Sequence, residues 1–116
     1  MYGTKVEDIF KLVDDELARA NKKFPLFSSD HEAFAVIQEE VEETEEAMEQ
    51  IKDDMATLWG QIRGNEPTPM TNCYLYQQVF KHSMDVIQEA VQIAAMARKG
   101  ILSNESRMNQ KGKGKE

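Results

Sequence analysis

The apolar residues of the chain recur at intervals of three and four residues in three separate stretches, which is the period of an amphipathic helix. The first stretch runs from Val6 through Val13 and Leu17 to Ala20, with acidic and basic residues between the apolar positions. Because proline disfavours helix in the residue before it, we expect this helix to end before Pro25. A first amphipathic helix is therefore predicted in the N-terminal part of the chain.

The second stretch is the longest, and it begins with a cap. Ser29 is followed three residues later by Glu32, which is the spacing of a capping box. From there to Ile62 the apolar residues alternate steps of three and four, interrupted only by a threonine. This pattern predicts one long helix with a packing seam. The seam consists of Phe34, Ile37, Val41, Thr44, Met48, Ile51, Met55, Leu58 and Ile62.

A break and a third helix follow the long helix. Residues 64–69 hold two prolines and a glycine, which predicts a loop. Helical spacing returns from about Cys73 to Lys99, and Gly100 is expected to cap the end of that helix. The sequence shows no strand-like alternation, so it predicts an all-α helical bundle. Because three helices make a thin core, we expect oligomerisation, as a dimer or tetramer, to complete the bundle.

The length and the C-terminal composition indicate one domain followed by a tail. At 116 residues the chain has room for a single core. The C-terminal segment is polar and ends Lys-Gly-Lys-Gly-Lys-Glu, so it cannot bury enough apolar area to offset the entropy lost on ordering. We expect a helical domain over residues 1–102 and a flexible polar tail over residues 103–116.

Charge and hydropathy exclude several classes of function. The formal net charge of −7 argues against nucleic-acid binding, because phosphate backbones are held by clustered Lys and Arg. The apolar run at residues 93–97 is far shorter than the roughly 20 residues that span a bilayer, so no membrane span is expected. The lone Cys73 cannot form an intramolecular disulfide, and residues 1–10 lack the features of a secretory signal. Cytoplasmic localisation is therefore expected.

Acidic residues crowd the second helix, and a projection at about 100° per residue divides them into two groups. Four of them turn away from the seam and are expected to be solvated: Glu42, Glu46, Glu49 and Asp53. Glu40 and Glu43 instead lie on a flank shared with Ala47, and Glu39 lies at its far edge. That flank is expected to face a second helix.

The third helix is apolar on nearly every side over residues 86–97, and we therefore expect it to be buried. A polar stripe at helical spacing accompanies it, formed by His82, Asp85, Glu89 and Gln92. Buried carboxylates are costly unless they are paired or metal-bound, and a site made only of oxygen ligands suits Mg²⁺. The alternative for Glu89 is a salt bridge to Arg19, Lys22 or Lys81.

The histidines and two large apolar residues also have structural explanations. His31 lies in the first turn of the second helix, where a surface or capping neighbour is more common than a ligand. His82 is either an ordinary histidine at the edge of an amphipathic face or a residue that supports the metal ligands. Trp59 and Met96 are expected in the core rather than in contact with a nucleobase.

The acidic motifs resemble those of a known family. Glu39-Glu40-x-x-Glu43 on one helix, with Glu89 opening a second motif on the next, is similar to the MazG-like all-α nucleoside triphosphate pyrophosphohydrolases. The pattern of that family is Glu-Glu-x-x-Glu followed by Glu-x-x-Asp. The stretches 23–25, 31–41 and 89–97 look like a phage and bacterial branch of the family. The likeness extends over about residues 17–99.

The resemblance implies an activity and assigns residues to it. It implies hydrolysis of a nucleoside or deoxynucleoside triphosphate to the monophosphate and pyrophosphate, with Mg²⁺ as the cofactor and Mn²⁺ as the alternative. It assigns catalysis to Glu39, Glu40, Glu43 and Glu89. It assigns metal binding to Glu40, Glu43, Glu89 and Gln92, to which Asp85 is added one turn earlier on the helix. Gln92 stands where the family has Asp, and its amide oxygen can coordinate Mg²⁺ without adding charge.

Two other functions are alternatives to this enzyme. Because Gln92 departs from the family pattern, the chain is alternatively a nucleotide-binding protein that hydrolyses slowly or not at all. The long seam and the acidic stripe alternatively belong to a helical interaction module that docks a basic partner. The three hypotheses differ in what they expect with Mg²⁺ and nucleotide: turnover, binding without turnover, or neither.

Overall fold

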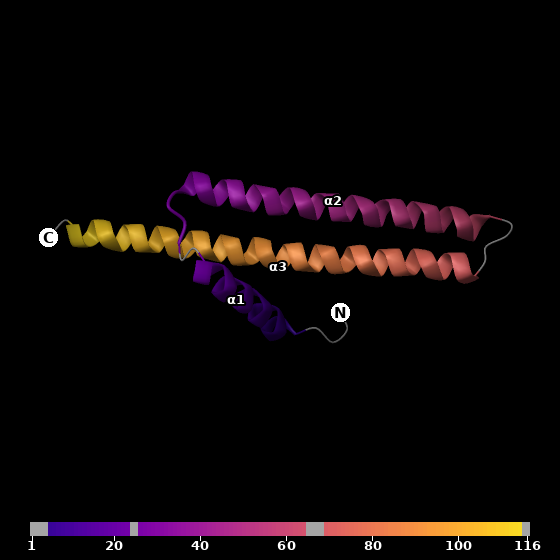
Figure 1. Ribbon diagram of the computed structural model, residues 1–116, viewed down its shortest axis with the longest axis horizontal. Coiled ribbons are helices and arrows are strands. Elements are labelled where there is room, and N and C mark those ends of the chain that lie inside the picture. The colour runs from indigo at the N-terminus through magenta and orange to yellow at the C-terminus, as the bar shows by residue number, and fades with distance from the viewer. Residues whose placement is uncertain (1–4, 24–25, 65–68, 115–116) are drawn as a thin grey trace. The chain divides into compact units, whose positions relative to one another are not determined.

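The protein folds into helices alone. The computed structural model describes residues 5–23, 26–64 and 69–114, with side chains described up to residue 110. Within these ranges it contains three helices and no strand: α1 spans Val6–Lys23, α2 spans Asp30–Arg63 and α3 spans Pro69–Gly114 (Figure 1). The predicted all-α helical bundle is therefore confirmed. None of these helices combines the length and apolar character that crossing a bilayer requires, within the part of the chain described.

Most of the helix boundaries follow the sequence signals. α1 ends at Lys23, ahead of Pro25, as predicted, while Phe24 and Pro25 themselves lie outside the described residues. α2 is the single long helix that the periodicity indicates, and it ends at Arg63. α3 begins at Pro69, which is earlier than the sequence indicated. Proline is well suited to the first helical position, where its missing N–H has no intrahelical acceptor.

The chain forms two compact units, one comprising Met1–Glu40 with Ala90–Glu116 and the other comprising Val41–Glu89. In the first unit, Val13 and Leu17 lie one turn apart on α1 and are buried with Met96 of α3. The core position expected for Met96 is therefore confirmed. The remaining buried members of this core are Phe27, Ala33 and Ala95.

In the first unit, the segment before α2 is anchored to the C-terminal part of α3. The backbone N–H of Phe27 donates to Ser103 Oγ at 2.9 Å, and Arg107 donates to the carbonyl of Phe27 at 3.3 Å and to Asp30 Oδ1 at 2.9 Å. Lys99 Nζ lies 4.8 Å from the centre of the Phe27 ring, within the range of a cation–π contact. These contacts fix the chain at the point where α2 begins.

The predicted cap of α2 forms in part. The backbone N–H of Glu32 donates to Ser29 Oγ at 3.1 Å, which is the contact expected of an N-cap serine. The Glu32 carboxylate accepts a hydrogen bond from Ser28 Oγ at 2.5 Å. Asp30 and Glu32 place negative charge in the first turn, where the helix dipole favours it.

The predicted end of the third helix at Gly100 is wrong. α3 continues through Gly100 to Gly114, so the domain boundary expected after residue 102 falls inside a helix. The physical reason lies at Ser103, which is only 1% exposed and holds the Phe27 backbone. The hydrogen bonds of Ser103 and Arg107 compensate for the low apolar content of this segment. Lys115 and Glu116 of the predicted tail lie outside the described residues.

In the second unit, α2 and α3 pack through a seam that agrees with the predicted one in part, since Leu58 is buried and Val41, Thr44 and Ile51 are half-buried as expected. Ala47 and Leu58 of α2 are buried with Leu75 of α3, and Asp54 is half-buried between the two α2 positions. Met48, Met55 and Ile62, which the sequence placed in the seam, are 40–50% exposed. The packed face is therefore rotated by about half of the 100° step of one residue, toward the flank that carries Glu40 and Glu43. Small Ala47 permits close approach, and Asp54 is accommodated because it has a partner on α3.

The continuity of α3 can be tested by replacing Gly100 with alanine. A Cβ at Gly100 meets no heavy atom within 4 Å, and its backbone is helical, so we expect Gly100→Ala to raise the free energy of unfolding by about 0.5–1 kcal/mol. Urea denaturation followed by circular dichroism measures this change.

The matched control is Gly60→Ala, at an equally open position within α2, which is expected to give a similar gain. If Gly100 capped a helix in the left-handed conformation, alanine there would instead destabilise the protein, because a Cβ is strained in that region. A loss of stability in Gly100→Ala alone would therefore contradict an uninterrupted α3.

Candidate metal-binding site

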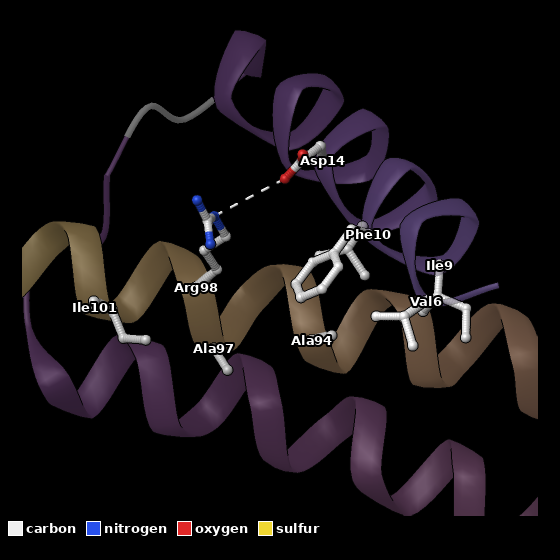
Figure 2. Close-up of a pocket in the computed structure, with 9 residues that line it drawn as sticks. Val6, Ile9, Phe10, Asp14, Ala94, Ala97, Arg98 and Ile101 are labelled. Atoms are coloured by element: carbon white, nitrogen blue, oxygen red, sulfur yellow. Dashed lines mark ion pairs between the residues drawn. The ribbon is translucent and has the colours of Figure 1, made fainter.

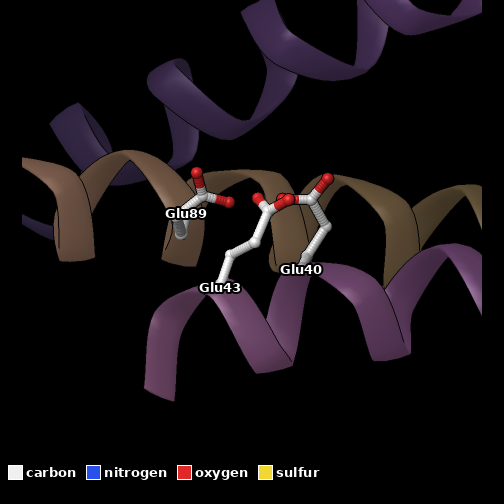
Figure 3. A group of neighbouring side chains, drawn as sticks. All are labelled: Glu40, Glu43 and Glu89. Atoms are coloured by element: carbon white, nitrogen blue, oxygen red, sulfur yellow. The ribbon is translucent and has the colours of Figure 1, made fainter. Parts of the chain in front are cut away.

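Three glutamates form the group that the sequence motifs singled out. Within the second unit, a carboxylate oxygen of Glu43 and one of Glu89 lie within 4.8 Å of each other (Figure 3). Glu43 is exposed, while Glu40 and Glu89 are half-buried. Glu40 and Glu43 lie three residues apart on α2, which places them on one side of the helix, and Glu89 projects from α3. The first motif and the start of the second are therefore brought together.

The packing of the second unit explains how Glu43 and Glu89 meet. Glu43 lies one turn before the buried Ala47 on α2, and Glu89 lies two turns after His82 on α3. Ala47 and His82 both belong to the seam through which the two helices face each other. Each glutamate therefore projects from the edge of the seam toward the neighbouring helix.

A hollow with a volume of about 450 Å³ opens beside these glutamates within the second unit. Its lining consists of Glu43, Glu46, Ala47, Gln50, His82, Asp85 and Glu89. Four of these seven residues are carboxylates and one is a histidine, so the hollow is strongly acidic. An anionic ligand would be repelled here unless a cation accompanied it.

Within this hollow, Asp54 of the second unit holds His82 in place. The sequence did not identify Asp54. His82 Nδ1 lies 2.7 Å from Asp54 Oδ2, and the two side chains are only 16% and 14% exposed. A carboxylate on one ring nitrogen orients the imidazole and leaves Nε2 as the remaining polar atom. Asp54 shares the packed side of α2 with Ala47, seven residues earlier, which is the only sequence signal that distinguishes it from its exposed neighbour Asp53.

Within the first unit, Gln92 is paired with Glu40. With its amide oriented so that the nitrogen faces Glu40, Gln92 Nε2 donates to Oε2 and Oε1 of that carboxylate at 2.6 and 3.3 Å. An aspartate at this position would repel Glu40, whereas the amide supports its orientation. Gln92 is thus a neighbour of Glu40, and its direct coordination of a metal stays a prediction.

The donor set suits a hard divalent cation. All three grouped side chains offer carboxylate oxygens, which are the ligands that Mg²⁺ prefers, and none offers sulfur. Two oxygens on one Mg²⁺ lie at most about 4 Å apart, since each bond is about 2.1 Å long. The separation of up to 4.8 Å therefore requires only a small inward shift of flexible side chains. Glu43 and Glu89 fit the ion that the resemblance implies, and Glu40 offers the same type of ligand.

The other predicted site residues have different surroundings. Glu39 is exposed and lies four residues before Glu43 on α2, outside the group of three. Asp85 lines the hollow without belonging to that group. Their catalytic and ligand roles stay predictions. Arg19, one of the alternative partners considered for Glu89, forms an ion pair with Glu16 at 2.9 Å.

The exposure of the remaining residues agrees with the sequence analysis except at Trp59. The four acidic residues expected in solvent are all exposed, although Glu46 also lines the hollow. His31 is exposed in the first turn of α2, in agreement with a surface position. The prediction that Trp59 lies in the core is wrong: the residue is 58% exposed, with Arg63 over its ring at 5.8 Å.

A second hollow lies in the first unit and has a different chemical character. It has a volume of about 340 Å³ and lies between α1 and α3 (Figure 2). Apart from Asp14 and Arg98, whose side chains approach to 4.0 Å, its lining is apolar. The apolar lining consists of Val6, Ile9, Phe10, Val13, Ala94, Ala97 and Ile101. Its single carboxylate, Asp14, lies beside Arg98, so this lining does not offer the several carboxylates that would hold a metal–phosphate complex.

The Asp54–His82 pair is expected to stabilise the second unit. Replacing Asp54 with alanine leaves the largely buried His82 Nδ1 without its acceptor, so Asp54→Ala should lower the free energy of unfolding by about 1–2 kcal/mol. Asp53→Ala, at the exposed neighbouring position, should change it by less than about 0.5 kcal/mol. Urea denaturation of both variants measures the difference, and equal effects would show that the pair contributes nothing.

Comparison with known proteins gives no relative from which to transfer a function. No family model matches the chain, and no match is found among curated proteins or among solved structures. The glutamates, the acidic hollow and the motif residues are therefore the features of the chain that indicate a function.

Proposed function

We propose that the protein is a Mg²⁺-dependent nucleoside triphosphate pyrophosphohydrolase of the MazG-like type. The observation that supports this most strongly is the approach of Glu43 and Glu89 within the second unit, where their carboxylate oxygens lie within 4.8 Å of each other beside the acidic hollow. These are two of the four residues to which the sequence motifs assign catalysis. The proposal places the protein in the cytoplasm, where nucleoside triphosphates are present.

The electrostatic character of the site favours a substrate that arrives with a cation. The chain has a formal net charge of −7, and the lining of the hollow is acidic. A triphosphate alone would be repelled by both, whereas a magnesium–triphosphate complex can be held by Glu43 and Glu89 at the hollow. A bound Mg²⁺ would neutralise negative charge on the phosphate oxygens, including the charge that develops there in the transition state.

The reaction cleaves the bond between the α- and β-phosphates. A water oxygen bonds to the α-phosphorus, the bridging oxygen leaves with pyrophosphate, and the proton of the water passes to a base. Glu39 is the proposed group that orients this water, since it lies one turn before Glu43 on α2 and is open to solvent. His82, oriented by Asp54, lines the hollow and is a second group that can accept a proton.

A specific contact supports the second candidate, which is a protein that binds nucleotide without hydrolysing it. Gln92 occupies the position where the family has a carboxylate, and its amide donates to Glu40. That hydrogen bond withdraws electron density from one of the proposed ligands, and the amide adds no negative charge. Binding of a magnesium–nucleotide complex would persist in such a site, while turnover would be slow.

The enzyme proposal is tested by neutralising two of the grouped carboxylates. Glu43→Gln and Glu89→Gln each remove a charge with little change in volume, so we expect magnesium-dependent pyrophosphate release to fall at least about 100-fold in each variant. Release is measured over a panel of canonical and modified nucleoside triphosphates, with and without Mg²⁺. A thermal-shift measurement on the same mixtures reports binding.

Glu42→Gln is the matched control, because this exposed residue precedes Glu43 but lies on the flank assigned to solvent. Its turnover should stay within about twofold of the unmodified protein. Turnover that survives in both Glu43→Gln and Glu89→Gln would contradict the site. Stabilisation by magnesium and nucleotide without any release would favour the binding protein instead.

A further inference from the structure

In the first unit, α3 covers only half of the apolar stripe of α1. Val6, Phe10, Val13 and Leu17 follow one another at helical spacing, which places them on one side of α1. Val13 and Leu17 are buried in the core, whereas Val6 and Phe10 are 63% and 59% exposed. The N-terminal half of the stripe is therefore open to solvent.

Small side chains on α3 explain why a hollow of about 340 Å³ remains beside this open half. α3 presents Ala94 and Ala97 to the hollow, and these side chains are too short to fill the space between the two helices (Figure 2). Pockets for small molecules have volumes of roughly 300–1,000 Å³ and combine apolar walls with a few polar groups. The hollow has the size and the wall character of such a pocket.

Two opposite charges stand at the edge of the hollow. Arg98 Nε and Asp14 Oδ1 lie 4.0 Å apart, and Figure 2 shows the two side chains pointing toward each other from α3 and α1. A direct hydrogen bond would need a separation of about 2.7–3.2 Å, so each side chain keeps bonding capacity for a third group. Arg98 can hold a carboxylate through paired N–H donors, and Asp14 can accept hydrogen bonds from an ammonium group. The edge therefore suits a ligand that carries both charges next to each other.

We propose that this hollow binds a free amino acid with a large apolar side chain. The apolar side chain lies against Phe10 and Ala97. The α-carboxylate pairs with Arg98 and the α-ammonium group with Asp14. Because a single carbon joins these two groups, both can reach side chains that stand 4.0 Å apart. Apolar walls and charge complementarity thus point to one class of ligand.

Other small ligands match this edge less well. A fatty carboxylate pairs with Arg98 but brings its negative charge beside Asp14, and an aliphatic amine has the converse conflict with Arg98. A nucleotide brings several negative charges to a single cation. An uncharged apolar molecule fills the hollow but makes no use of the charged pair.

Exposure of the charged pair determines how affinity is divided between the two parts of the ligand. The side chains of Arg98 and Asp14 are 55% and 62% exposed, so solvent screens their attraction to a ligand. Burial of the apolar side chain must therefore supply most of the affinity. Affinity should rise from glycine through L-leucine to L-phenylalanine, and the charged groups should discriminate among ligands with the same side chain.

The test is a titration of the isotope-labelled full-length chain with L-phenylalanine, followed through the amide chemical shifts in nuclear magnetic resonance spectra. Neither Mg²⁺ nor nucleotide is added, so the result is independent of the acidic site. Saturable shifts should map to residues 6–14 and 94–101, and glycine should bind at least about tenfold more weakly. N-acetyl-L-phenylalanine lacks the ammonium group and L-phenylalanine amide lacks the carboxylate, so each should bind about fivefold more weakly.

Two variants disturb the two parts of the site separately. Ala97→Leu extends a branched side chain into the hollow from an exposed position and should weaken L-phenylalanine binding at least about tenfold. Arg98→Gln removes the cation, so it should weaken binding about fivefold and abolish the preference for L-phenylalanine over its amide. The matched control is Arg19→Gln, since Arg19 of α1 pairs with Glu16 outside the lining, and its affinity should be unchanged.

Circular dichroism verifies that each variant is folded, and Arg98→Gln at a largely exposed position keeps the test decisive if Ala97→Leu does not fold. Equal binding of N-acetyl-L-phenylalanine, or an affinity that folded Arg98→Gln retains in full, would overturn the proposal. The absence of saturable shifts at tens of millimolar L-phenylalanine would overturn it as well. If a second copy covers the hollow instead, the same amides will shift on dilution of the free protein and will not respond to the amino acid.

Discussion

The hydrogen bond between Asp54 and His82 determines how α2 and α3 face each other in the unit Val41–Glu89. Apolar contacts tolerate sliding and rotation, but a largely buried carboxylate must keep its partner within hydrogen-bond distance. The pair therefore selects one register and one rotation of each helix. Glu43 and Glu89 approach each other in that arrangement, and Met48 and Met55 are turned outward. The acidic hollow and the exposed positions of Met48 and Met55 are two results of one polar contact in the seam.

The first unit shows the same use of polar contacts where apolar residues are few. Ser103 and Arg107 lie in a segment of low apolar content, yet they bind the backbone on both sides of Phe27. Ser103 Oγ also donates to the carbonyl of Lys99 at 2.8 Å, so one buried hydroxyl is satisfied by both α3 and the segment before α2. The start of α2 is held by α3 through these bonds rather than by a large apolar core.

Much of this architecture could be predicted from the sequence, because periodicity records which side of a helix is apolar. The three helices, the break near Gly64 and the flank shared by Glu40 and Glu43 all follow from it. The rotation of the seam does not, because apolar residues extend beyond the packed side of α2 and shift the apparent centre toward Met48. The sequence alone does not show that Asp54 rather than Asp53 is half-buried, because this depends on His82 lying opposite Asp54 on α3. Gly100 is equally compatible with a cap and with a helix interior until the contacts of Ser103 are known.

One flank of α2 is acidic and the other is apolar, so inserting or deleting residues within α2 would change which flank lines the hollow. Each residue advances an α-helix by about 100°. A one-residue deletion between Glu43 and Asp54 would therefore turn Glu43 by that angle relative to the His82 contact and carry its carboxylate out of the hollow. An insertion of seven residues, close to two full turns, would restore the rotation but move the glutamate by about 10 Å along the axis. Among related chains, matching insertions in α2 and α3 would preserve the packing of the two helices, whereas unmatched ones would separate the acidic site from the Asp54–His82 pair.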